Sequence, residues 1–99
     1  MQSSYAERFE RDMGCTEAEW LGWMPRAIRE HVWHRDGNRM VVMIGTGTLT
    51  LTWAPLPERR IALLRMPRLL VTFHFEGLDA EQRLAFMKPF DLTIQRGGG

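Results

Sequence analysis

Apolar residues recur at four-residue intervals at the start of the chain, in "SSYAERFERDMG". Tyr5, Phe9 and Met13 would form one apolar stripe on a helix. A serine at the start of this stretch can cap such a helix, and Gly14 is suited to end it in a left-handed turn. The pattern predicts a first helix over residues 3–14.

A second helix is predicted from Thr16, because Glu19 stands three residues later, as in a capping box. The following segment, "WLGWM", is strongly apolar. Pro25 is expected either to kink this helix or to begin one more turn. Together the two segments predict a helical hairpin whose aromatic face must be covered.

From about Ile28 the apolar period changes to two. The sequence Asp36-Gly37-Asn38 is typical of a tight turn between two strands. In "TLTLTW" apolar residues and threonines alternate strictly, which predicts a half-buried antiparallel strand over residues 48–53. The two prolines of "APLPE" are expected to break that strand.

The second half of the chain predicts further strands and a helix. "RRIALLRM" and "RLLVTFHFEG" fit two strands, or one long strand bent at Pro67. "GLDAEQRLAFMK" fits a helix capped by Asp79, with Gln82 three residues later. Pro89 is expected to end or kink it. "FDLTIQ" fits either a final strand or the continued helix, and its alternation favours the strand.

These elements predict an α+β domain over residues 1–96. An N-terminal helical hairpin would pack on a meandering antiparallel sheet of four to five strands, with a late C-terminal helix. Residues 97–99, all glycine, would form a flexible tail.

Composition indicates a soluble globular chain, with 44% hydrophobic and 25% charged residues among 99. The first residues lack the apolar core of a secretory signal, and the apolar runs are too short to span a bilayer. The single cysteine, Cys15, excludes an internal disulfide. We expect a cytoplasmic protein. The net charge of +1 gives no general attraction to membranes or nucleic acid, so no membrane partner is expected.

The basic residues are unusual in kind, since twelve are arginine and one is lysine. Codon bias explains such a ratio, but arginine is also the better residue for binding anions. The segment from residue 59 to residue 75 contains no acid. It predicts a basic strand surface that contacts an acidic protein partner or an anionic ligand. The candidate binding residues are Arg59, Arg60, Arg65, Arg68 and His74.

A nucleic-acid-binding module using the same arginines is the alternative. Phe73 and Phe75 lie nearby, and a basic sheet with aromatic residues can stack on single-stranded bases. These two rings share a strand face with Leu69 and Val71, however, which predicts that they belong to the core. Nucleic acid is therefore possible as a partner but not favoured.

The tryptophan-rich helix predicts either core packing or an interface, since tryptophan and methionine are enriched at protein interfaces. We expect one of three tryptophans to be partly exposed and to contribute to a protein interface or to self-association. These candidates are Trp20, Trp23 and Trp33.

Catalytic and metal-binding patterns are weak. His31 and His34 would share one side of a helix, but the period of two places them on opposite faces of a strand, with no zinc-binding frame around them. Cys15 either lies at a helix start that lowers its pKa or is simply a small buried residue. We predict a non-enzymatic protein with no metal and no cofactor.

The final Gly98-Gly99 raises a second alternative, a carrier of the ubiquitin-like kind, whose terminal diglycine is adenylated and passed on. A strand at residues 90–95 would lead into the tail as it does in those carriers. The predicted order of elements, with two helices before the strands, differs from their β-grasp fold.

Overall fold

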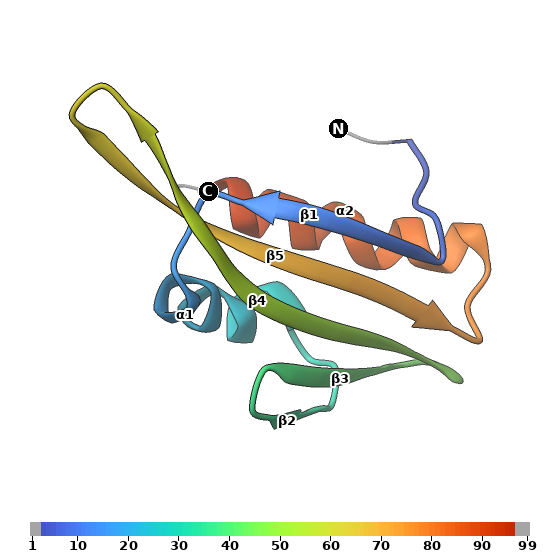
Figure 1. The fold of residues 1–99 in the computed structure, drawn as a ribbon. Helices are drawn as coiled ribbons and strands as arrows, with labels where there is room; N and C mark the ends of the chain where they lie inside the picture. The colour runs from blue at the N-terminus through green and yellow to red at the C-terminus, as the bar shows by residue number, and fades with distance from the viewer. Residues whose placement is uncertain (1–2, 97–99) are drawn as a thin grey trace.

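Five antiparallel strands form one sheet, and two helices pack on the same face of it (Figure 1). The structure is a computed structural model and describes residues 3–96. The sheet order is β1-β5-β4-β3-β2, so the first strand of the chain pairs with the last. The elements are β1 (Arg8–Met13), α1 (Glu17–Ile28), β2 (Trp33–Asp36), β3 (Arg39–Ile44), β4 (Gly47–Ile61), β5 (Leu64–Glu76) and α2 (Ala80–Arg96).

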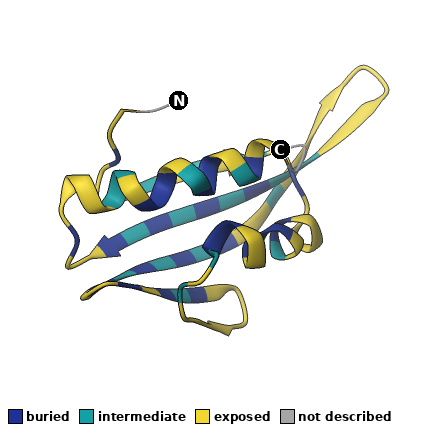
Figure 2. Ribbon diagram, turned by 180° about the vertical axis from the view of Figure 1, so that it is seen from behind, coloured by how far each residue is buried: buried dark blue, intermediate teal, exposed yellow. Residues whose placement is uncertain are grey.

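The core lies between the helices and one face of the sheet. Alternate residues of β4 and β5 are buried there, including Leu49, Leu51, Phe73 and Phe75, each with no exposed surface. The helices present buried residues to this face and exposed residues to solvent (Figure 2). The opposite face is partly covered at most and carries the threonines of "TLTLTW". In the described part of the chain, no helix combines the length and apolarity that crossing a membrane requires.

Several local predictions are confirmed. Thr16 caps α1 in a capping box with Glu19, whose backbone N–H donates to the Thr16 hydroxyl oxygen over 3.1 Å. The turn after Asp36 joins β2 to β3, with the two strands in antiparallel register. Asp79 and Gln82 bond reciprocally at the start of α2, where the Gln82 N–H donates to Asp79 Oδ1. The α+β class and the antiparallel sheet are confirmed as well.

The predicted N-terminal helical hairpin is wrong, because its first helix is strand β1. Phe9 and Met13 lie four positions apart, a spacing that suits one side of a helix and equally one face of a strand. In the structure Phe9 pairs with Phe73 and Met13 with Leu69, so both side chains turn toward the core. Glu10 and Asp12 between them face outward, whereas Arg11 shares the inward face and bonds to Asp91 of α2.

Of the two alternatives for residues 90–95, the favoured strand is wrong and the continued helix is confirmed, because α2 runs through Pro89 to Arg96. The buried residues of this region recur with helical spacing: Phe86, Met87, Phe90, Asp91 and Ile94. A strand would instead bury Leu92 with its alternate neighbours, and Leu92 is 39% exposed. The glycine tail at residues 97–99 lies outside the described residues, and a helix, not a strand, precedes it.

The prolines of "APLPE" do not end β4, which continues to Ile61. The Trp53 N–H donates to the Asn38 carbonyl on the β3 side, and by the alternation of the ladder Pro55 and Pro57 face that same side, beyond the end of β3. Proline is tolerated at such an edge because no hydrogen bond is lost. A β-bulge between Leu56 and Arg59 absorbs the extra residue.

The chain reverses at Ala62 and Leu63, so "RRIALLRM" is neither a separate strand nor part of one bent strand. It contains the end of β4, the turn and the start of β5. Ala62 has a φ of 55°, a left-handed conformation that glycine or asparagine usually takes. The turn therefore had no recognisable signal in the sequence. β5 runs straight past Pro67, which faces the β1 side beyond the end of β1.

Replacing Gly47 with alanine is expected to destabilise the fold by about 1–3 kcal/mol or more, through overpacking. An added Cβ would meet the backbone carbonyl oxygen of Glu76 and would lie 2.7 Å from both the Gly77 carbonyl oxygen and Leu78 Cγ. Gly22 is the matched control, since it is exposed in α1 with no atom within 4 Å of an added Cβ. Gly22→Ala is expected to stabilise by about 0.5–1 kcal/mol. Urea unfolding measures both, and equal effects at the two positions would contradict the close approach.

Candidate functional site

Residues 55–68 form a two-stranded arm that projects from the sheet (Figure 1). β4 pairs with β3 only up to Thr52, and β5 pairs with β1 only from Leu69 onward. Beyond those points the two strands pair with each other alone. The arm contains four arginines and one acid, Glu58.

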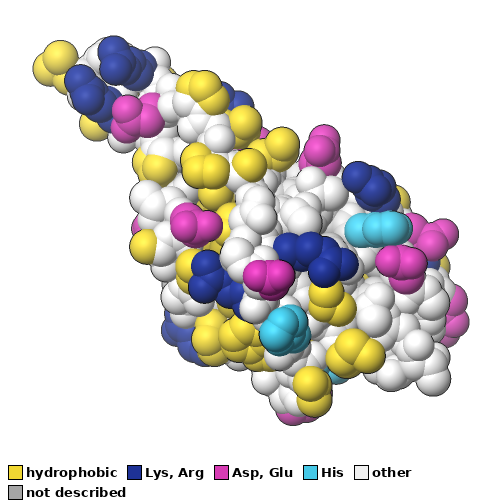
Figure 3. All heavy atoms as spheres, turned by 60° about the horizontal axis from the view of Figure 1, so that its bottom comes forward, with side chains coloured by type: hydrophobic (Ala, Val, Ile, Leu, Met, Phe, Trp, Pro, Cys, Tyr) yellow, Lys and Arg dark blue, Asp and Glu magenta, His cyan; other side chains and the backbone are white. Residues whose placement is uncertain are grey.

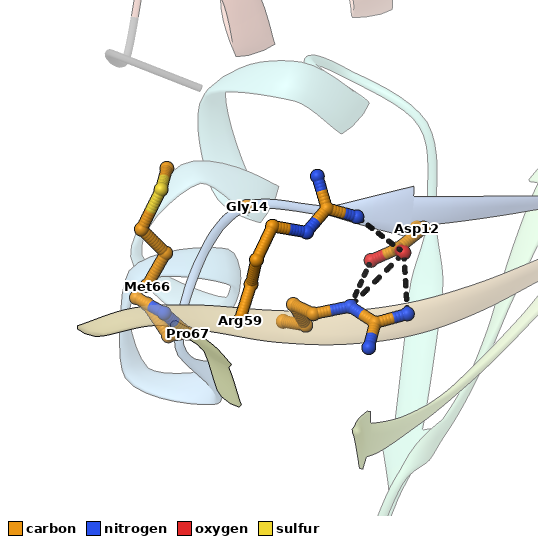
Figure 4. Close-up of a pocket in the computed structure, with 6 residues that line it drawn as sticks. Asp12, Gly14, Arg59, Met66 and Pro67 are labelled. Atoms are coloured by element: carbon orange, nitrogen blue, oxygen red, sulfur yellow. Dashed lines mark hydrogen bonds and ion pairs between the residues drawn. The ribbon is translucent and has the colours of Figure 1, made fainter. Parts of the chain in front are cut away.

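At the base of the arm, Asp12 of β1 forms ion pairs with two of its arginines (Figure 4). Arg68 donates two hydrogen bonds to Asp12 Oδ2, from Nη2 over 2.7 Å and from Nε over 3.1 Å, and Arg59 Nη2 lies 3.6 Å from the same oxygen. The Arg68 hydrogen bond is the main cause of a lowered pKa at Asp12. These residues line a small pocket of about 80 Å³. Since Asp12 already supplies the anion between the two guanidinium groups, this pocket is poorly suited to a second one.

The distal part of the arm keeps its positive charge. Arg60 and Arg65 are directly paired across the two strands, so their side chains leave the same side of the arm. Both residues are exposed, and neither forms an ion pair with a carboxylate that the structure describes. Like charges directly opposite each other destabilise a strand pair. An external anion would relieve this repulsion.

The structure therefore divides the predicted binding residues into three groups. Arg59 and Arg68 hold the base of the arm, and Arg60 and Arg65 are available beyond it. His74 is on β5 opposite Arg8 and Thr50, six residues from Arg68 and so about 20 Å along the strand. It belongs to the open face of the sheet and not to the arm.

The three tryptophans also divide. Trp20 is fully buried and Trp23 is 7% exposed, so both side chains are part of the core, whereas Trp33 is 40% exposed. The expectation that one of them is partly exposed is confirmed for Trp33. An interface role stays a prediction, and of the three only Trp33 offers appreciable surface for it.

The aromatic rings beside the arginines are core residues, as their shared face predicted. Phe73 and Phe75 have no exposed surface, and Phe73 stacks on Phe9 with ring centroids 4.7 Å apart. The arm itself contains no aromatic residue. A stacking surface for bases would have to lie elsewhere.

Cys15 is 1% exposed, and burial raises the pKa of its thiol to about 11. Of the two alternatives for Cys15, the small buried residue is therefore confirmed, and a pKa lowered by the start of α1 is not. His31 lies before β2 and not within a strand. Within residues 3–96 no three histidine, cysteine or acidic side chains gather as a metal site would require.

One cluster of charged groups was not foreseen from the sequence. Asp91 of α2 accepts a hydrogen bond from the Tyr5 hydroxyl and is bonded by Arg11 of β1 through both oxygens, over 2.6 and 3.1 Å. Burial and the hydrogen bond to Asp91 raise the pKa of Tyr5 to about 12. The cluster joins the N-terminal segment, β1 and α2, so its role is to hold the fold together.

A shallow hollow of about 370 Å³ lies between α2 and the segment after α1. Arg29 borders it, but this guanidinium donates to the carbonyl oxygens of Ala27 and Phe86 and lies 5.0 Å from the centre of the Phe86 ring. These contacts give Arg29 a structural role, as the residue that closes the end of α1 against α2.

Two features of the arm could not be read from the sequence. Asp12 lies 56 residues before Arg68, and it reaches Arg68 because β1 pairs with β5. The apolar residues around the turn fit the interior of a strand equally well. The one trace of the exposed apolar turn in the sequence is the apolar run between arginines in "RRIALLR".

No protein-family model matches this chain, and it has no significant match among curated proteins or solved structures.

Proposed function

We propose that this protein works by binding, and that its arm contacts an anionic partner surface through Arg60 and Arg65. The observation that carries the proposal is the direct pairing of these two exposed arginines at the far end of a projecting ribbon. Such a pair costs stability in the free protein. An acidic partner, as the sequence predicted, would supply the missing counter-charge.

The proposal is of a binding protein and not of an enzyme. Two side chains with catalytic potential are engaged in the fold, since Cys15 is buried and Asp91 is held by Tyr5 and Arg11. The arginines of the arm, in contrast, stand on a surface that a large partner can approach. A nucleic acid would meet the same charges through its phosphates, but the arm provides no aromatic ring for its bases.

Reversing both distal charges, with Arg60→Glu and Arg65→Glu, is expected to weaken binding to fluorescein-labelled polyglutamate at least about tenfold at low salt. Fluorescence anisotropy across a salt series measures the loss. Arg68 is left unchanged because its variant would also break the base at Asp12. The reversal keeps a like-charge pair across the strands, so the stability should not change.

The matched control reverses two exposed arginines outside the arm, Arg26 and Arg39. It changes net charge equally, and we expect it to weaken binding much less. If both double variants lose affinity equally, binding to polyglutamate depends on the net charge of the protein, and the arm is not the binding element. A parallel titration with a mixed single-stranded oligonucleotide tests the nucleic-acid alternative, which predicts tighter binding than to polyglutamate and a steep salt dependence.

A further inference from the structure

The far end of the arm is apolar as well as basic. Three large apolar residues at the turn are exposed: Ile61 (54%), Leu63 (99%) and Leu64 (65%). Met66 (44%) lies behind Arg65, opposite Arg59. Single exposed leucines are ordinary on a protein surface. Three such residues together at the end of a projection are not, and a contiguous exposed apolar patch marks an interaction site. Figure 3 shows the arm standing away from the body, with hydrophobic and basic side chains at its end and an acidic side chain beside them.

The turn places these residues at the extremity. Ile61 pairs with Leu64, so Ala62 and Leu63 form a two-residue connection. Leu63, at the turn, is almost completely exposed. Ala62 accepts a left-handed φ of 55°, a conformation unfavourable for alanine. A glycine here would relax the backbone, whereas the sequence keeps apolar side chains at all four positions from 61 to 64.

Polarity changes in layers along the arm. The apolar tip, residues 61–64, comes first, and Arg60 and Arg65 follow directly behind it. At the base Asp12 forms ion pairs with Arg59 and Arg68. Arg65 is two residues from Leu63, about 7 Å along an extended strand. The interface of an anionic bilayer has the same order, since apolar side chains are buried about 5–10 Å into the boundary between headgroups and acyl chains while basic side chains are attracted to the anionic headgroups.

We infer that the tip of the arm inserts into the interface of an anionic lipid bilayer, with Arg60 and Arg65 at the level of the lipid phosphates. This inference rests on the proposed function, since it identifies the anionic surface as lipid. A second copy of the chain fits less well, because two arms meeting at their tips would bring four arginines together. An acidic protein would need an apolar pocket for Leu63 within its charged surface, while a bilayer offers both layers everywhere.

Binding is tested by co-sedimentation with phosphatidylcholine vesicles that contain or lack phosphatidylserine. We expect wild-type protein to sediment with the anionic vesicles and not with the neutral ones. The tip variant Leu63→Ser/Leu64→Ser keeps every charge, and it should lower the partition coefficient at least about tenfold. The matched control is Val32→Ser/Met43→Ser, which removes exposed apolar surface away from the arm and should sediment like wild type.

Insertion is tested separately with a fluorophore at the tip. A Leu63→Cys variant can be labelled selectively, since Cys15 is buried and its thiol pKa is raised. An environment-sensitive dye there should shift to shorter emission wavelength with anionic vesicles. The same dye on Val32→Cys should not shift.

The outcomes separate the two proposals. If vesicle binding requires Arg60 and Arg65 but the tip variant binds as well as wild type, the insertion inference is overturned. An electrostatic contact with an anionic surface would then remain. Tight binding to polyglutamate with no binding to anionic vesicles would overturn the lipid inference in favour of an acidic protein. Failure to bind either probe would overturn both.

Discussion

Asp91→Asn is expected to lower the free energy of unfolding by about 3 kcal/mol, because it leaves a half-buried guanidinium without its counter-charge. Arg11 Nη1 lies 2.6 Å from Asp91 Oδ1, and their side chains are 21% and 12% exposed. The asparagine would turn either a neutral oxygen or an NH₂ group toward Arg11, and the Tyr5 hydroxyl would lose a charged acceptor. Three parts of the fold meet at this carboxylate, so the loss should be cooperative.

Chemical denaturation measures this effect, with Asp79→Asn as its control. Asp79 is an exposed helix cap, and asparagine caps helices about as well as aspartate. The control should therefore change stability by a few tenths of a kcal/mol at most. If the free energy of unfolding of Asp91→Asn is within about 1 kcal/mol of the wild-type value, this ion pair does not stabilise the fold as proposed.

Alkaline pH is expected to destabilise the protein steeply, through Cys15 and Tyr5. The pKa of Cys15 is raised from 9.0 to about 11, and that of Tyr5 from 10.0 to about 12. Both groups hold their protons more tightly in the folded state, so the unfolded chain releases protons first. Stability is full below pH 9 and is lost as the pH rises toward 12, by about 3 kcal/mol from each group.

The composition allows this titration to be assigned to single groups. Tyr5 is the only tyrosine and Lys88 the only lysine, while the twelve arginines stay charged throughout. Tyrosinate absorbance should appear only above pH 10 and together with unfolding. Tyr5→Phe and Cys15→Ala should each flatten the loss between pH 9 and 12. Tyrosinate that forms near pH 10 in a folded protein would show that the hydroxyl is not held by Asp91.

The sequence was informative where one local signal had one meaning. The capping box at Thr16, the turn at Gly37 and the cap at Asp79 each placed an element correctly. The sequence was not informative where both a helical period and a strand period fit the same residues. Phe9 and Met13 satisfied both a helix and a strand, and the pairing with β5 decided for the strand. Pro89 suggested an end to a helix that packing against the sheet continues.

The arginine cluster was found from composition, but its division was not. Arg59 and Arg68 are tied to Asp12 by a strand pairing that no local pattern announces. The apolar tip was hidden because Ala62 and Leu63 are not turn residues. A net charge of +1 argued against anionic surfaces, whereas the folded protein concentrates positive charge on one projection. A net charge close to zero for the whole chain therefore does not exclude a strongly basic region on the folded surface.

The three prolines of the arm have a consequence for aggregation. A long ribbon with both edges unpaired is a template onto which another strand can add, and repetition of that step leads to fibrous association. Pro55, Pro57 and Pro67 sit at outward-facing positions of the two edges, where each removes an N–H that an incoming strand would need. The three prolines therefore lower the tendency of other copies of the chain to add strands to the exposed edges of the arm.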